Sequence, residues 1–262
     1  MIHQFFLTQS ESKNFSARIF VHFFLIIVIF SSNAIAQGNT KKILIDVAHG
    51  QKFWNDPNDM NGMDQNIVDR VKYMTSEISK NAKSVNASIG YLKGKIKPAD
   101  LAACDMLFIH IPSSTYEAAE VSAINDYLQK GGSLFLVTDE DYWATLDQTG
   151  INNIVTPVGI TFAGNNPDTL SGGYTKPSPI TNKKMKITFH GGRIVKGGTP
   201  FCFTNQSETY PFGTYTQLQG GGKIVAMGDG MTSLYMTTWK EVNDYQCSEF
   251  MHEVFAWLLK EE

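Results

Sequence analysis

Short apolar runs separated by amphipathic stretches dominate the chain from about residue 41 onward. Four of the runs are apolar almost throughout and are bounded by polar residues, which is typical of buried strands. They are Lys42–Val47, Met106–Ile111, Ser133–Thr138 and Lys223–Met227. Ala87–Leu92 shows a weaker pattern of the same kind. Strands that are apolar throughout favour a parallel sheet with helices on both faces.

Helical periodicity appears between these runs. Apolar residues from Ile67 to Ile78 recur at the spacing of one helix face, which predicts an amphipathic helix. Ser114 and Glu117 have the spacing of a capping box, and the helix that they open is expected to end before Gly131. A last helix is predicted over Cys247–Leu258. The sequence therefore predicts an α/β protein built as a three-layer sandwich.

Residues 159–219 have a different character. They are rich in Gly, Thr and Pro and contain short alternating runs such as Met185–Phe189. This composition predicts antiparallel β structure, either inserted in the α/β body or packed beside it. We therefore expect one domain over residues 37–262 that carries a β-rich insertion at about 159–219.

The first 36 residues have the pattern of an export signal. Basic residues precede the apolar run Ile19–Phe30, and Ala34-Ile35-Ala36 follows it, which together predict a signal peptide cleaved after Ala36. The twelve apolar residues would span roughly 18 Å as a helix, short of a membrane core of about 30 Å, although an uncleaved anchor is the alternative. A secreted or periplasmic protein is expected, with no membrane span in the mature chain.

Composition narrows the classes of function. The chain has 262 residues and a formal net charge of -3, which gives no basic surface for nucleic acid. Three cysteines are too few for a disulfide-built scaffold. Cys202 and Cys247 could pair in an oxidising compartment, or all three thiols could be buried and reduced. No sequence feature indicates a cofactor.

The four strands that are apolar throughout are followed by polar residues. Parallel strands bring their carboxyl ends to one edge of the sheet, where α/β proteins bind their ligands. We therefore expect a shared crevice there. The residues predicted to line it are Asp46, His49, His110, Ser113, Asp139, Glu140 and Asp229, with Trp54 from the loop after the first strand.

Each of these residues also has an ordinary structural explanation. Asp46 and His49 suit an acid/base pair or metal ligands, but Asp46 could instead cap a helix or fix the loop. His110 lies inside an apolar strand and could be a hydrogen-bonded core histidine. Trp54 could stack on a sugar or simply pack in the core.

The acidic residues likewise have two explanations. Asp139 and Glu140 could bind a cation or a sugar hydroxyl, or could complement the dipole at a helix start. Asp229 has the same two explanations, with Gly228 and Gly230 forming a tight turn in both.

Three segments together resemble a known fold family. They read ILIDVAHG from Ile43, CDMLFIHIPSSTYEAAEVSAINDYLQKGGSLFLVTDED from Cys104, and GGKIVAMGDGMTSLY from Gly221. These segments are similar to the class I glutamine-amidotransferase-like fold, in the non-amidotransferase branch that includes gliding-motility, intraflagellar-transport and trehalose-utilisation-type domains. The resemblance implies a flavodoxin-like three-layer sandwich. The turn that holds the nucleophilic Cys of amidotransferases is here Thr138-Asp139-Glu140, so glutamine hydrolysis is not expected.

The function expected from these features is that of an exported binding or accessory domain. By analogy with the trehalose-utilisation-type relatives, a glycan or other small molecule is the expected ligand. The alternative is a hydrolase acting on carbohydrate, in which Asp46 and His49 work with strand-end carboxylates and a metal assists. A third hypothesis is a cell-envelope protein partner bound by the β-rich insertion.

Overall fold

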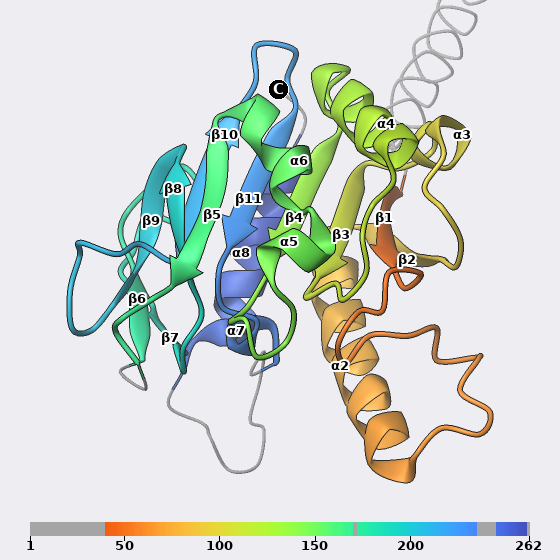
Figure 1. Ribbon diagram of the computed structural model, residues 1–262, viewed down its shortest axis with the longest axis horizontal. Coiled ribbons are helices and arrows are strands. Elements are labelled where there is room, and N and C mark those ends of the chain that lie inside the picture. Colours follow the sequence, from red (N-terminus) through yellow and green to blue (C-terminus); the bar gives the residue numbers. More distant parts are fainter. Residues whose placement is uncertain (1–39, 170–171, 235–244, 261–262) are drawn as a thin grey trace, which may run out of the picture. The chain divides into compact units, whose positions relative to one another are not determined.

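The computed structural model describes residues 40–169, 172–234 and 245–260 (Figure 1). Within these ranges the chain forms one large sheet in the order β2-β1-β3-β4-β11-β10-β9-β6-β7 and a separate two-stranded sheet of β5 and β8. The strands are β1 (Lys41–Asp46), β2 (Ala87–Leu92), β3 (Met106–His110), β4 (Ser133–Val137), β5 (Ile160–Asn165), β6 (Gly173–Thr175), β7 (Lys186–Ile187), β8 (Arg193–Gly197), β9 (Thr199–Thr204), β10 (Gly213–Gln217) and β11 (Lys223–Met227). The helices are α2 (Gln65–Ser84), α3 (Pro98–Leu101), α4 (Ala118–Gln129), α5 (Leu146–Thr149), α6 (Asn152–Val155), η1 (Thr156–Val158), α7 (Met231–Leu234) and α8 (Cys247–Leu259).

The parallel half of the sheet consists of β2, β1, β3, β4 and β11. Within this half, every pair of adjacent strands is parallel. All residues of β3, β4 and β11 are buried, because helices cover both faces of the sheet there. The mixed α/β fold with a mostly parallel central sheet is confirmed.

The strand pleat divides the core into two layers. Ile43 and Ile45 of β1 face one side of the sheet and pack in the core that α2 and α8 cover. Leu44 points to the other side and joins the core under α4 and α6. Figure 1 shows these helices on opposite faces of the sheet, which gives the three-layer sandwich.

The segment 159–219 is rich in antiparallel β structure. β10 pairs antiparallel with β11, and β9, β6 and β7 continue the same sheet outward in antiparallel order. Only β5 and β8 form a separate ribbon, which packs Phe162 and Val195 into the core on the α4 side. Most of the segment therefore extends the central sheet.

The predicted signal peptide, residues 1–36, lies outside the described residues. No helix in the described part of the chain is both long and apolar enough to cross a membrane. All three cysteines are free; Cys202 and Cys247 are buried, and Cys104 is half-buried. The buried and reduced alternative therefore describes Cys202 and Cys247.

Candidate functional site

The carboxyl ends of β1, β3, β4 and β11 lie along one edge of the sheet. Parallel pairing aligns Ile45 with Phe108, His110 with Val137, and Val137 with Met227, so the four strands end at similar height. This shared edge, predicted from the strand pattern, positions the loops that carry the candidate residues.

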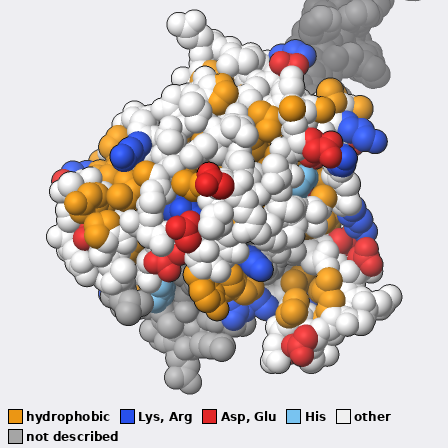
Figure 2. Space-filling view, viewed as in Figure 1, with side chains coloured by type: hydrophobic (Ala, Val, Ile, Leu, Met, Phe, Trp, Pro, Cys, Tyr) orange, Lys and Arg blue, Asp and Glu red, His pale blue; other side chains and the backbone are white. Residues whose placement is uncertain are grey.

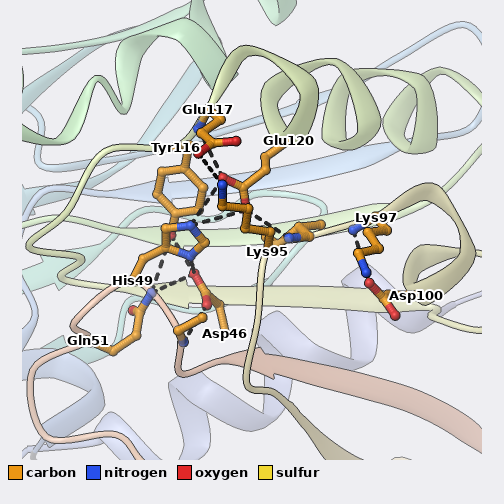
Figure 3. Close-up of polar contacts among 11 residues, drawn as sticks. Asp46, His49, Gln51, Lys95, Lys97, Asp100, Tyr116, Glu117 and Glu120 are labelled. Carbon is orange, nitrogen blue, oxygen red and sulfur yellow. Dashed lines mark hydrogen bonds and ion pairs between the residues drawn. The ribbon is translucent and has the colours of Figure 1, made fainter.

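His49 lies between two carboxylates at the end of β1. Its Nδ1 is 2.8 Å from Asp46 Oδ2, and its Nε2 is 3.2 Å from Glu120 Oε1. All three side chains are buried, with exposed fractions of 0% for Asp46, 6% for His49 and 2% for Glu120. Figure 3 shows the imidazole held between the two acids, with the ring of Tyr116 against its face.

Two further side chains complete this group around Asp46. The Tyr116 hydroxyl donates to Asp46 Oδ2 at 2.6 Å, and Gln51 Nε2 donates to the same oxygen at 2.8 Å. The other oxygen, Oδ1, accepts from the backbone N–H of Ala48. The carboxylate is therefore fully engaged by groups of its own protein.

The start of α4 explains how Glu120 reaches His49. The predicted capping box of Ser114 and Glu117 is wrong, because the helix begins one turn later, at Ala118, with Glu117 as its N-cap. Glu120 is the third helical residue, and its carboxylate accepts from the N–H groups of Glu117 and Ile96. The sequence analysis did not identify Glu120, because its contact with His49 joins residues far apart in the chain.

The charges of His49, Asp46 and Glu120 stabilise one another. Burial alone would lower the pKa of His49, but the hydrogen bond to Asp46 and the charges of Asp46 and Glu120 outweigh burial and raise the pKa. Burial would raise the pKa of Glu120, but the N–H groups of Glu117 and Ile96, together with His49, hold it below its usual value. Both effects favour an imidazolium between two carboxylates.

His110 lies at the end of β3 and is fully buried. Its Nδ1 is 3.3 Å from the carbonyl of Lys52, and its Nε2 is 2.5 Å from Ser233 Oγ and 3.3 Å from the carbonyl of Gly230. Burial lowers the pKa of His110 to about 4, so the ring is neutral at neutral pH. It connects the loop after β1 with the turn after β11.

Trp54 is buried as well, with 4% of its surface exposed. Its ring meets those of Phe108 and His110 edge-on, with centroids 5.3 and 5.9 Å apart. Protein therefore covers the indole, and Trp54 offers no exposed face for stacking.

The acidic residues after β4 and β11 are largely held by the backbone. Asp139 accepts from the N–H of Glu140 at 2.7 Å and of Gly230 at 3.0 Å. Asp229 accepts from the N–H of His190 at 3.2 Å and is 1% exposed. Burial raises the pKa of Asp139 to about 7, against the opposing effect of the two N–H groups. Glu140 itself is half-buried beside this turn.

Hydrogen bonds join these residues into one network along the edge. Gln51 Oε1 accepts from the backbone N–H of His110 at 2.6 Å, which links the Asp46 group to β3. Gly230 in turn lies between His110 and Asp139. Ser113 fastens the loops above β1 and β3, since its Oγ donates to the carbonyl of Gly50 and its N–H to that of His49.

The expected crevice is largely closed by its own side chains. The cavity described at this edge has a volume of about 10 Å³, room for about one water molecule. It is lined by Ile111, Pro112, Thr138, Asp139, Ala144, Leu146, Thr149 and Arg193. A larger cavity of about 570 Å³ lies at the opposite, amino edge of the sheet.

The turn after β4, where the sequence resemblance would place an amidotransferase nucleophile, carries no thiol. Thr138 and Asp139 occupy the turn after β4, and both are buried. Cys104 precedes β3 and lines the cavity at the amino edge. No group of three or more His, Cys, Asp or Glu side chains in the described part of the chain is arranged to hold a metal ion.

No family model matches the chain, and no curated protein matches its sequence. Solved structures do match its fold. The mmIFT52 N-terminal domain is similar over 84% of this chain and 98% of its own length, with a TM-score of 0.61 and 19% sequence identity.

Two bacterial structures resemble the chain to a similar extent. A putative thua-like protein from Bacteroides uniformis is similar over 88% of this chain and 96% of its own, with a TM-score of 0.53 and 11% identity. A cytoplasmic protein from Salmonella typhimurium is similar over 84% and 97%, with a TM-score of 0.53 and 11% identity. The chain therefore shares its fold with these structures, which include the intraflagellar-transport and thua-like types that the sequence motifs resemble.

Proposed function

We propose that the protein is an exported binding or accessory domain without amidotransferase chemistry, linked to carbohydrate handling or to the cell envelope. One observation carries this proposal. The strand-end residues, including Asp139 at the nucleophile position, are buried and bonded to their own loops, so they support the edge rather than present a reacting group. The exposed loops at this edge are then the part available to a ligand.

Two features support the remaining parts of the proposal. The pattern from Ile19 to Ala36 supports export. The resemblance to trehalose-utilisation-type domains supports a carbohydrate ligand, and an envelope protein is the other partner to be tested.

A hydrolase is the second candidate, and the environment of Asp139 favours it. A carboxyl group with a pKa of about 7 can both take up and release a proton near neutral pH. The adjoining cavity has room for one water molecule. In such an enzyme Asp139 would act on that water, while Asp46 and His49 would hold the neighbouring loop.

The experiment that separates the two candidates measures binding and turnover on the same samples. Purified protein beginning at Gln37 is titrated by calorimetry with neutral oligosaccharides, and the mixtures are then assayed for new reducing ends. We expect binding without cleavage. Cleavage that Asp139→Asn abolishes would establish the hydrolase, and the absence of both binding and cleavage would contradict a carbohydrate function.

A further inference from the structure

Three aromatic side chains and one arginine form a row on the surface at the carboxyl edge. Tyr142 and Trp143 follow β4, with ring centroids 5.0 Å apart, and the Trp143 ring lies 5.5 Å from that of Phe53 in the loop after β1. The Arg70 guanidinium of α2 lies 5.0 Å from the Phe53 centroid. Figure 2 shows hydrophobic side chains gathered on the lower part of this face, where these loops lie in Figure 1.

The row is open to solvent. Tyr142 is 83% exposed, the highest value among the large hydrophobic side chains of the described residues, and Phe53 and Trp143 are half-buried. Burying an aromatic side chain removes roughly 150 to 250 Å² of surface from water and stabilises the fold. An exposed ring does not contribute this stabilisation. Such a ring next to two others is a recognised mark of a contact surface.

A buried cation holds the loop that carries the two central rings. Arg193, which is 1% exposed, donates through Nη2 to Asp141 Oδ1 at 2.6 Å and to the carbonyl of Ala144 at 2.8 Å. These two acceptors lie on either side of Tyr142 and Trp143 in the chain. The N–H of Trp143 also donates to the carbonyl of Glu140. The aromatic pair is therefore fixed before any ligand arrives, which reduces the entropy lost on binding.

Phe53 is held in a strained conformation. Its φ is +66°, a strained value that bulky residues rarely adopt. The loop tolerates this strain while presenting the ring to Trp143 and Arg70. Strain that persists in a surface loop is a common property of binding sites.

We infer that the row Phe53, Trp143 and Tyr142 is the surface on which this protein binds a neutral glycan. The inference rests on the proposed carbohydrate function and names its site. The C–H groups of a sugar face carry partial positive charge and stack on the negative faces of aromatic rings. The adjacent carboxylates of Glu140 and Asp141 can accept hydrogen bonds from sugar hydroxyls.

Charge selects a neutral ligand over an acidic one. Arg70 lies beside the row and Arg193 is paired with Asp141, so with Glu140 the charges around the row balance. A surface without excess positive charge gives no attraction for a polyuronate or phosphorylated chain. The Trp143 ring is inclined at 76° to that of Phe53 and at 79° to that of Tyr142, so the rings face different directions and suit different units of an oligosaccharide.

The test is calorimetric titration of the protein beginning at Gln37 with cellohexaose, chitohexaose, maltohexaose and an acidic galacturonate oligomer. For the neutral oligomer that binds the parent protein, Trp143→Ala and Tyr142→Ala should each raise the Kd about tenfold or more. Tyr142→Phe, which keeps the ring, should bind within about twofold of the parent. Tyr174→Ala, in the β-rich insertion, is the control for loss of an aromatic ring elsewhere, and it should bind like the parent.

The results of these titrations test the binding site and the proposed carbohydrate function separately. If the parent binds a neutral oligomer and both alanine variants bind it equally well, this site is wrong while the carbohydrate function stands. If the parent binds no oligomer, the proposed function fails and the inference fails with it. Tighter binding of the acidic oligomer, with the same loss in the alanine variants, would overturn the choice of a neutral ligand.

Discussion

His49 and Glu120 are 71 residues apart in the chain and meet through a 3.2 Å contact between Nε2 and Oε1. One residue belongs to the loop after β1 and the other to the first turn of α4. Because Asp46 holds the opposite side of the imidazole, the contact joins a strand end to a helix start through one buried charged group. The group therefore stabilises the carboxyl edge of the sheet.

Glu120→Gln should destabilise the protein by about 3 kcal/mol. The substitution removes one of the two negative charges that compensate the buried His49 imidazolium. A buried charge without full compensation destabilises the folded state. Glu117→Gln is the matched control, three residues away on the same helix start; its side chain is 55% exposed and paired with Lys95, and it should cost less than about 1 kcal/mol. Urea unfolding monitored by circular dichroism measures both. Equal losses would show that the His49 contact adds nothing.

The raised pKa of His49 makes folding stability depend on pH. The folded state binds the proton more tightly than the unfolded state does, so the contribution is fully present below pH 6.5 and is lost as pH rises through the folded-state pKa. The free energy of unfolding should therefore fall above pH 6.5 in the parent protein. His49→Gln, which cannot titrate, should show a flatter profile over the same range. Parallel profiles for the two proteins would contradict a raised pKa.

Asp139 should titrate near neutral pH. Its pKa of about 7 lies above the value of 3.8 for a free aspartate, so its contribution to stability is complete below pH 3.8 and is lost between there and about pH 7. Carbon-13 NMR of aspartate-labelled protein gives the midpoint directly, with the exposed Asp147 as reference. A midpoint for Asp139 below pH 5 would contradict the raised pKa. It would show that the two backbone N–H donors lower the pKa as much as burial raises it.

Much of the fold could be predicted from the sequence because the parallel strands are apolar throughout. β3, β4 and β11 fall within the predicted apolar runs, since burial on both faces leaves little room for polar residues. The start of α4 was harder to predict. Ser114 was the predicted cap, but the helix starts at Ala118 with Glu117 as its N-cap.

The site was only partly predictable, for a different reason. Asp46 and His49 stand three residues apart, so their contact is local and their types suggested it. Tyr116 and Glu120 reach the same group from 70 and 71 residues away, and only the packing of α4 beside β1 brings them there. Side chains joined by tertiary contact leave no spacing signal in a single sequence.

Gly228→Ala should destabilise the turn that joins β11 to the β5–β8 ribbon. A Cβ at Gly228 would lie 2.1 Å from the carbonyl oxygen of Arg193, a backbone atom that cannot move aside without breaking the neighbouring hydrogen bonds. We expect a loss of about 3 kcal/mol or failure to fold. Gly164→Ala is the control, because nothing lies within 4 Å of its added Cβ. Thermal unfolding compares the two, and a similar melting temperature would show that the turn can widen.

Thiol chemistry should distinguish Cys104 from the other two cysteines. Cys202 and Cys247 are 0% exposed, so a thiol reagent should reach neither in the native protein. Cys104 is half-buried and lines the cavity at the amino edge, but burial raises its pKa to about 11, so it should react slowly at pH 8. In denaturant all three thiols should react, because the structure holds no disulfide. Cys104→Ser should abolish labelling of the native protein while leaving two thiols to titrate after unfolding. A single reactive thiol in denaturant, in protein recovered from an oxidising compartment, would instead show that Cys202 and Cys247 pair there.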